Sequence, residues 1–158
     1  MLRVGFGYDA HRLKQGRDLI LGGVKIPHEK GLLGHSDADV LSHAVGEAML
    51  GALGLGDLGT HFPDTDQKHK DVSSLKILSV INNLAKEQNA TLMNIDSTVV
   101  AEEPKLSAYI PKMRENLADT LEISIDCVSI KATSTEGMGF VGTKEGMAAY
   151  AVVLVDKK

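Results

Sequence analysis

Residues Arg3–Leu13 read RVGFGYDAHRL, and this stretch decides how the chain begins to fold. Apolar or aromatic residues occupy every second position, namely Val4, Phe6, Tyr8 and Ala10. The positions between them are Arg3, Gly5, Gly7, Asp9 and His11. A period of two is typical of a β-strand, whose successive side chains point to opposite faces. The pattern therefore predicts a strand that projects Asp9 and His11 from the face opposite its aromatic side chains, with two glycines leaving room beside them.

Outward from this strand, the clearest pattern is a helix over residues 35–56. Apolar side chains recur there at helical spacing, and Ser36 or Asp37 is available as the N-cap. Gly54 and Gly56 stand where the pattern stops, as is common at helix C-termini. This helix carries His43 at a flank of its apolar stripe.

The remaining segments alternate between strand and helix patterns. They predict a hairpin at 18–27 around Gly22-Gly23, helices over 72–90 and 106–123, and strands over 91–101, 127–134 and 146–156. Residues 56–71 contain Gly, Pro and several Asp without periodicity, which predicts a loop of a length that is often functional. The last strand is apolar on both faces, which predicts a central, covered strand. One mixed sheet with helices mainly on one face, an α+β fold, is the most economical assembly.

The composition limits the class of protein. The 158 residues are 43% hydrophobic and 24% charged, which predicts a single domain, residues 1–158, with a substantial core. No apolar run approaches the roughly 20 residues that span a bilayer. A net charge of −4 with few aromatic residues argues against a nucleic-acid partner and for a small substrate. The single Cys127 is expected to be buried and inert, and without a secretory pattern we expect a cytoplasmic protein.

Asp9, His11 and His43 are candidate metal ligands. A lone histidine at the flank of an apolar stripe is more often a hydrogen-bonded helix residue than a ligand. Two histidines and a carboxylate, however, complete three corners of a zinc tetrahedron and leave the fourth corner open, as in catalytic zinc sites. The hypothesis requires residues 9 and 43 to meet in the fold.

Two further groups of polar residues have both a functional and a plainer interpretation. His35 and Ser36 precede the helix, where unpaired backbone N–H groups attract phosphate, although Ser there is also a common cap. Asp57, Asp64 and Asp66 in the predicted loop form turns or accept hydrogen bonds from ligand hydroxyls.

The stretch KATSTEGMGF, residues 131–140, gathers hydroxyls and one carboxylate at the end of a predicted strand. Such a polar strand end is usually a turn. Hydroxyls beside the carboxylate of Glu136 also suit a diphosphate and its hard divalent cation, which takes oxygen ligands.

Five motifs in order, GYDAHRL, GHSDADVLSHA, GDLGTHFPDTD, AEEPKL and KATSTEGMGF, resemble those of the 2-C-methyl-D-erythritol 2,4-cyclodiphosphate synthases of the non-mevalonate isoprenoid pathway. The resemblance covers essentially the whole chain. It implies a homotrimer with active sites between neighbouring subunits. It also implies a Zn²⁺ ion held by Asp9, His11 and His43, and a second divalent ion, Mg²⁺ or Mn²⁺, held by Glu136.

The same resemblance implies a set of substrate and catalytic residues. His35 and Ser134 would be catalytic, and Ser134 keeps the hydroxyl of the Thr that is usual at its position. The implied substrate contacts, besides the metal ligands Asp9, His11 and Glu136, are His35, Ser36, Asp57, Leu58, Gly59, Phe62, Asp64, Thr65, Asp66, Ala101, Pro104, Lys105, Leu106, Ala132, Thr133, Ser134, Thr135, Phe140 and Thr143. Many members of the family have an arginine where this chain has Thr143, so the isoprenoid diphosphate site proposed near the three-fold axis is not transferred to it.

The implied reaction is a cyclisation that releases CMP. In 4-diphosphocytidyl-2-C-methyl-D-erythritol 2-phosphate, the 2-phosphate attacks the β-phosphorus of the diphosphate of the same molecule, and no protein nucleophile is needed. The protein has to neutralise charge and position a flexible chain. Two alternatives remain at the level of the sequence: a zinc-dependent phosphoesterase that uses the same three ligands, and a non-catalytic trimeric nucleotide-binding module.

Overall fold

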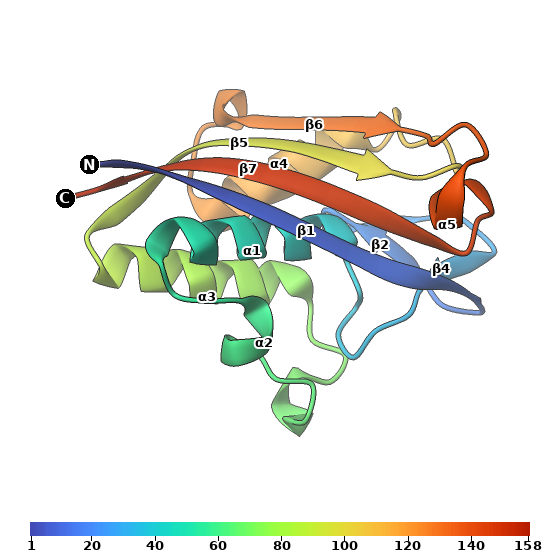
Figure 1. Ribbon diagram of the computed structural model, residues 1–158, viewed down its shortest axis with the longest axis horizontal. Helices are drawn as coiled ribbons and strands as arrows, with labels where there is room; N and C mark the ends of the chain where they lie inside the picture. Colours follow the sequence, from blue (N-terminus) through green and yellow to red (C-terminus); the bar gives the residue numbers. More distant parts are fainter.

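Five strands form one mixed sheet in the computed structural model, which describes all residues 1–158 (Figure 1). Strand β7 (Gly146–Lys157) lies in the centre, between β1 (Leu2–Gln15) and β5 (Ala90–Val100). The short strands β4 (Lys30–Leu32) and β6 (Val128–Thr133) form the two edges. Only β5 and β6 are parallel, because a helical crossover connects them; the other pairs are antiparallel. The single α+β domain and the central position of the last strand are confirmed.

Three helices cover one face of this sheet (Figure 1). They are α1 (Val40–Leu53), α3 (Ser74–Glu87) and α4 (Ile110–Leu121). Helix α1 lies against β1 and β7 and is buried along most of its length; α3 packs beside α1, and α4 packs against α3. The core therefore lies between one helical layer and one face of the sheet.

The predicted hairpin forms a separate two-stranded sheet at the side of the core. Strands β2 (Leu19–Leu21) and β3 (Val24–Ile26) pair antiparallel. Gly22 and Gly23 have φ angles of +54° and +71°, which the missing Cβ makes accessible.

Several local expectations were wrong. The N-cap of α1 is Asp39, not Ser36 or Asp37, because the side chain of Asp39 accepts from Ser42 N–H at 3.0 Å. The predicted loop at 56–71 contains two short helices, α2 (Leu58–His61) and the 3₁₀ turn η1 (Gln67–His69). Sequence periodicity cannot reveal helices of three or four residues. For the same reason, strand β4 and two short helices, η2 (Ile125–Cys127) and α5 (Gly139–Gly142), were not predicted.

The glycines of β1 allow its backbone to contact that of α1 directly. A Cβ atom placed on Gly7 would lie 1.9 Å from the carbonyl oxygen of Ala44, and one on Gly5 would lie 1.8 Å from that of Ala48. No side chain fits between strand and helix at these positions. The close approach brings Asp9 and His11 on β1 near His43 on α1.

Gly7→Ala is therefore expected to lower the free energy of unfolding by about 3 kcal/mol, because α1 must move away from the sheet. Gly51→Ala is the matched control: it lies exposed in α1, where a Cβ meets only Phe6 O at 3.9 Å, so it should be neutral or slightly stabilising. Urea denaturation of both variants measures the difference. Equal stability of the Gly7→Ala variant and the wild type would contradict the direct contact.

The opposite face of the sheet is uncovered except at one end, where Val141 of α5 packs against Val100 and Ala148. Its centre carries apolar side chains from β1 and β7, with exposed fractions of 68% for Val4, 62% for Phe6 and 44% for Tyr8, Tyr150 and Val152. The ring centroids of Tyr8 and Tyr150 are 5.0 Å apart. The expectation that the last strand is covered on both faces is thus wrong for the single chain.

Two smaller expectations concern membranes and Cys127. No helix in this structure has both the length and the apolar character needed to cross a bilayer. Cys127 is a free thiol of intermediate burial at the end of η2, so the expectation of a fully buried residue was wrong.

Candidate metal and substrate site

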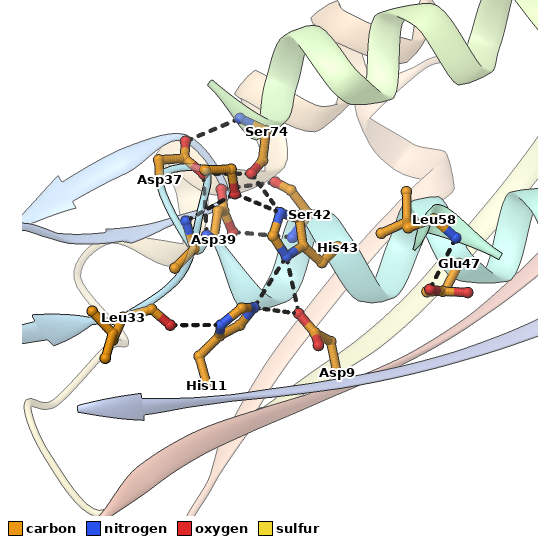
Figure 2. Close-up of polar contacts among 12 residues, drawn as sticks. Asp9, His11, Leu33, Asp37, Asp39, Ser42, His43, Glu47, Leu58 and Ser74 are labelled. Atoms are coloured by element: carbon orange, nitrogen blue, oxygen red, sulfur yellow. Dashed lines mark hydrogen bonds and ion pairs between the residues drawn. The ribbon is translucent and has the colours of Figure 1, made fainter. Parts of the chain in front are cut away.

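Asp9, His11 and His43 meet at one point, as Figure 2 shows. Asp9 Oδ2 lies 2.8 Å from His11 Nε2 and 3.0 Å from His43 Nδ1. The two imidazole nitrogens are 3.2 Å apart. All three side chains are largely buried, with 12% to 26% of each side chain exposed. The predicted encounter between residues 9 and 43 is confirmed.

The partners of His11 define which of its nitrogens is free. His11 Nδ1 lies 2.9 Å from the carbonyl oxygen of Leu33, which can only accept, so Nδ1 carries a proton. In the neutral imidazole, the lone pair on Nε2 then points at Asp9 and His43. The opposite nitrogen of His43, Nε2, faces away from this point and toward two serine hydroxyls.

These atoms fit a divalent cation. One carboxylate oxygen and two imidazole nitrogens, each from a different side chain, lie within 4.8 Å of one another. Two histidines with one carboxylate are a common protein ligand set of catalytic zinc. The chain contains no second group of three such residues.

The electrostatics of the group favour an ionised carboxylate. Burial of Asp9 opposes ionisation, but the contacts of its carboxylate with the imidazoles of His11 and His43 outweigh this effect and lower the pKa of Asp9 to about 2. Burial acts to lower the pKa of His11, yet the hydrogen bond and charge of Asp9 raise it overall. The three side chains thus attract positive charge to one point.

A cavity of about 390 Å³ opens beside this group. Nine residues proposed from the sequence line it: Asp9, His11, His35, Ser36, His43, Leu58, Gly59, Phe62 and Asp64. Four others line it unpredicted: Gly34, Glu47, His69 and Ile77. Glu47 stands four residues after His43, a spacing that places both side chains on one helix face, and this spacing is the sequence signal that could have pointed to it. Burial raises the pKa of Glu47, which accepts from Leu58 N–H at 3.1 Å.

Three predicted residues of the segment 56–71 do not line this cavity. Asp57 caps α2 by accepting from Thr60 N–H at 2.8 Å, and Asp66 caps η1 by accepting from Lys68 N–H at 3.0 Å. In this structure both side chains therefore stabilise turns, which is the plainer of the two interpretations given for them from the sequence. Thr65 also lies outside the lining.

The first turn of α1 binds one of its N–H groups within the chain, because Asp39 accepts from Ser42 N–H. Asp39 is fully buried and its carboxylate occupies the start of α1, where it also accepts from Gly22 N–H and Gly23 N–H. A phosphate contact at this helix end stays a prediction. His35 and Ser36 line the cavity from the segment before α1. Arg17 holds that segment by donating to three carbonyls, those of Leu32, Gly34 and Ser36.

A second cavity, of about 470 Å³, lies at the ends of β5 and β6. It is lined by seven of the predicted residues, Ala101, Pro104, Lys105, Leu106, Ala132, Thr133 and Ser134. Glu102, Ser107 and Ile110 join them unpredicted. Glu102 accepts from Thr135 N–H at 2.9 Å and from Thr135 Oγ1 at 3.1 Å, and so holds the turn that follows β6.

Besides Asp57, Thr65 and Asp66, four more predicted residues lie outside both cavities. Thr135 and the exposed Glu136 belong to the turn after β6, where Glu136 has a φ of +52°. Phe140 lines a third cavity with Tyr8 and Arg12. Thr143 ends helix α5.

The first two cavities are separated by the core. Strand register places Asp9 opposite Ala149, Ala149 opposite Val99, and Val99 opposite Ala132. Asp9 and Ala132 are therefore three strand spacings apart, or about 14 Å. Val99 and Ala149, which lie between them, are completely buried. The two cavities share no lining residue.

Comparison with known proteins places this architecture in a family. The model of the YgbB family matches residues 2–156. A 2-C-methyl-D-erythritol 2,4-cyclodiphosphate synthase of Alkaliphilus metalliredigens is 58% identical over 154 residues, which cover 98% of this chain and 97% of the relative.

Solved structures of similar proteins agree with this family assignment. The bifunctional IspDF of Campylobacter jejuni has a TM-score of 0.96 and 41% identity, over 100% of this chain and 43% of that chain. A CDP complex of IspF from Plasmodium falciparum has a TM-score of 0.87 and 33% identity, over 99% and 97% of the two chains. This chain therefore belongs to the YgbB family, the family of the 2-C-methyl-D-erythritol 2,4-cyclodiphosphate synthases.

Proposed function

We propose that the group formed by Asp9, His11 and His43 is the centre of the family's reaction, 2-C-methyl-D-erythritol 2,4-cyclodiphosphate synthesis in the non-mevalonate isoprenoid pathway. The substrate is 4-diphosphocytidyl-2-C-methyl-D-erythritol 2-phosphate. Its 2-phosphate oxygen forms a bond to the β-phosphorus, the bond from that phosphorus to the CMP oxygen breaks, and CMP leaves. The convergence of three metal-ligating atoms on a polar cavity carries this proposal.

Asp9, His11 and His43 would hold a Zn²⁺ ion, whose contribution when bound is positive charge beside the phosphates. The side chains around it supply donors and shape. His35 and Ser36 line the cavity next to the three ligands and can donate to phosphate oxygens. The cavity wall also contains Leu58, Gly59 and Phe62. Asp64, which lines the same cavity, can accept a hydrogen bond from a sugar hydroxyl.

The second cavity is the proposed cytidine and diphosphate half of the site. Lys105 supplies a positive charge, and Thr133 and Ser134 supply hydroxyl donors, with Ser134 acting on the transition state. The CDP complex of the Plasmodium falciparum protein supports a pocket for a cytidine diphosphate in this fold. Glu136 would hold Mg²⁺ or Mn²⁺ together with substrate oxygens, because such ions are commonly bound by one or two carboxylates plus phosphates.

The two halves of one site come from neighbouring subunits of a homotrimer in this proposal. About 14 Å of sheet and a filled core separate the halves within a chain. The uncovered apolar face of β1 and β7 supports association, because an exposed apolar patch of this kind marks an interaction surface.

Product analysis in H₂¹⁸O tests the activity. Cyclisation consumes no water, so ³¹P NMR and mass spectrometry should find the cyclic diphosphate and CMP, both without ¹⁸O. A zinc phosphoesterase would instead place ¹⁸O in a phosphate of its product. Binding of CMP without turnover would favour the non-catalytic module, and either of these two results would contradict the proposal.

A further inference from the structure

Ser74 touches His43 from the side away from the other two proposed ligands (Figure 2). It is the first residue of α3 and is completely buried. Its hydroxyl oxygen lies 2.8 Å from His43 Nε2. On its other side, the same hydroxyl is hydrogen-bonded to Oδ1 of Asp37.

The direction of these two hydrogen bonds follows from the number of available protons. A carboxylate oxygen only accepts, so the single proton of the Ser74 hydroxyl is donated to Asp37. The Ser74 oxygen must then accept from His43, which requires a proton on Nε2 of His43. In the neutral imidazole, Nδ1 is consequently unprotonated, and its lone pair points at Asp9 Oδ2 and His11 Nε2.

Asp37 is itself held in place from two helix starts. Its Oδ2 accepts from the backbone N–H of Ser74 at 3.0 Å, and its Oδ1 accepts from the backbone N–H of Asp39 at 3.2 Å. The hydrogen-bonded series Asp37–Ser74–His43 is therefore fixed at its Asp37 end by the N-terminal ends of both α1 and α3. Its inner end is the imidazole nitrogen that faces the cavity.

We propose that Ser74 and Asp37 are positioning residues that fix His43 in the tautomer and ring orientation required to bind a metal ion through Nδ1. This inference rests on the proposed function, because it assigns His43 as a zinc ligand. A ligating histidine whose second nitrogen donates to an oriented acceptor is a better-placed and more basic ligand. Neither Ser74 nor Asp37 lines the substrate cavity, so their effect passes through His43.

Ser36 provides a partial substitute. Its hydroxyl lies 3.1 Å from His43 Nε2, but it also accepts from Ala38 N–H at 3.2 Å and has no carboxylate behind it. Loss of Ser74 should therefore weaken the metal site without abolishing it. We expect a fall of about 10- to 100-fold in zinc affinity, the range found for partners of metal ligands.

The test measures zinc binding by competition with a chelator in Ser74→Ala, with Ser73→Ala as the matched control. Ser73 is the adjacent residue at the same helix end, and its side chain makes no capping hydrogen bond. Ser73→Ala should bind zinc like the wild type. If Ser74→Ala also does so, the positioning role is overturned while the zinc site stands. If the wild type binds no zinc, or His43→Ala binds it unchanged, the proposed function fails and this inference falls with it.

A second readout separates positioning of His43 from simple capping of α3. In zinc-loaded protein labelled with ¹⁵N-histidine, NMR should show a slowly exchanging Nε2–H on His43 that exchanges faster in Ser74→Ala. Asp37→Asn removes the negative charge of the carboxylate and keeps its shape. It is the variant to test if Ser74→Ala does not fold. It should also weaken zinc binding and speed this exchange. A Nε2–H signal and zinc affinity unchanged in Asp37→Asn would overturn the proposal.

Discussion

His43→Ala should lose zinc and lower kcat/KM by at least about a thousandfold, as expected when a site loses preorganised charge stabilisation. A site with only three protein ligands cannot spare one of them. The fold should survive, because the residue lies at the flank of α1 and the rest of that helix remains packed against β1 and β7. We expect the free energy of unfolding to fall by no more than about 2 kcal/mol.

Metal analysis of the purified variant and steady-state kinetics measure these effects. His28→Ala is the matched control, because His28 belongs to neither cavity and should keep both zinc and activity. Stoichiometric zinc together with normal turnover in His43→Ala would mean that His43 is only a hydrogen-bonded helix residue.

Mixing two inactive variants should restore about a quarter of wild-type activity. His43→Ala destroys the zinc half of the proposed site, and Glu136→Ala destroys the half that holds the second ion. In mixed trimers, a site is intact when a Glu136→Ala chain supplies the first half and a His43→Ala chain supplies the second. Random assembly at equal amounts gives a probability of about one half times one half, or one quarter, provided that the sites act independently.

The experiment requires separation and reassembly of the subunits, with mass spectrometry to confirm mixed trimers. Each variant subjected alone to the same treatment is the control and should stay inactive. A site formed within one chain is never repaired by mixing. Background activity in confirmed mixed trimers would therefore reject a site shared between subunits.

The sequence predicted the parts of the site that depend on local periodicity. Alternation along β1 placed Asp9 and His11 on one face, and helical spacing placed His43 on α1. That the two elements meet depends on Gly5 and Gly7 lying against the backbone of α1, a tertiary contact that no local pattern contains.

Other features could not be predicted from the sequence because tertiary contacts determine them. Asp39 became the N-cap of α1 since the hairpin glycines Gly22 and Gly23 also donate to its carboxylate from a distant part of the chain. Strand β7 is buried mainly on one face, and this too depends on how the whole sheet is covered rather than on the strand's own sequence. The pairing of Ser74 with His43 joins residues 31 positions apart and leaves no periodic signal.

The backbone contact between β1 and α1 also bears on how selectively the site binds metals. Since no side chain intervenes at Gly5 or Gly7, the spacing between the ligands of β1 and that of α1 is set by two regular backbones. Such a frame loses little conformational entropy when an ion enters, because the ligands are already assembled. The ligand set adds selectivity by chemistry: Ca²⁺ takes about six to eight oxygen ligands, whereas two of the three side chains held here offer imidazole nitrogens.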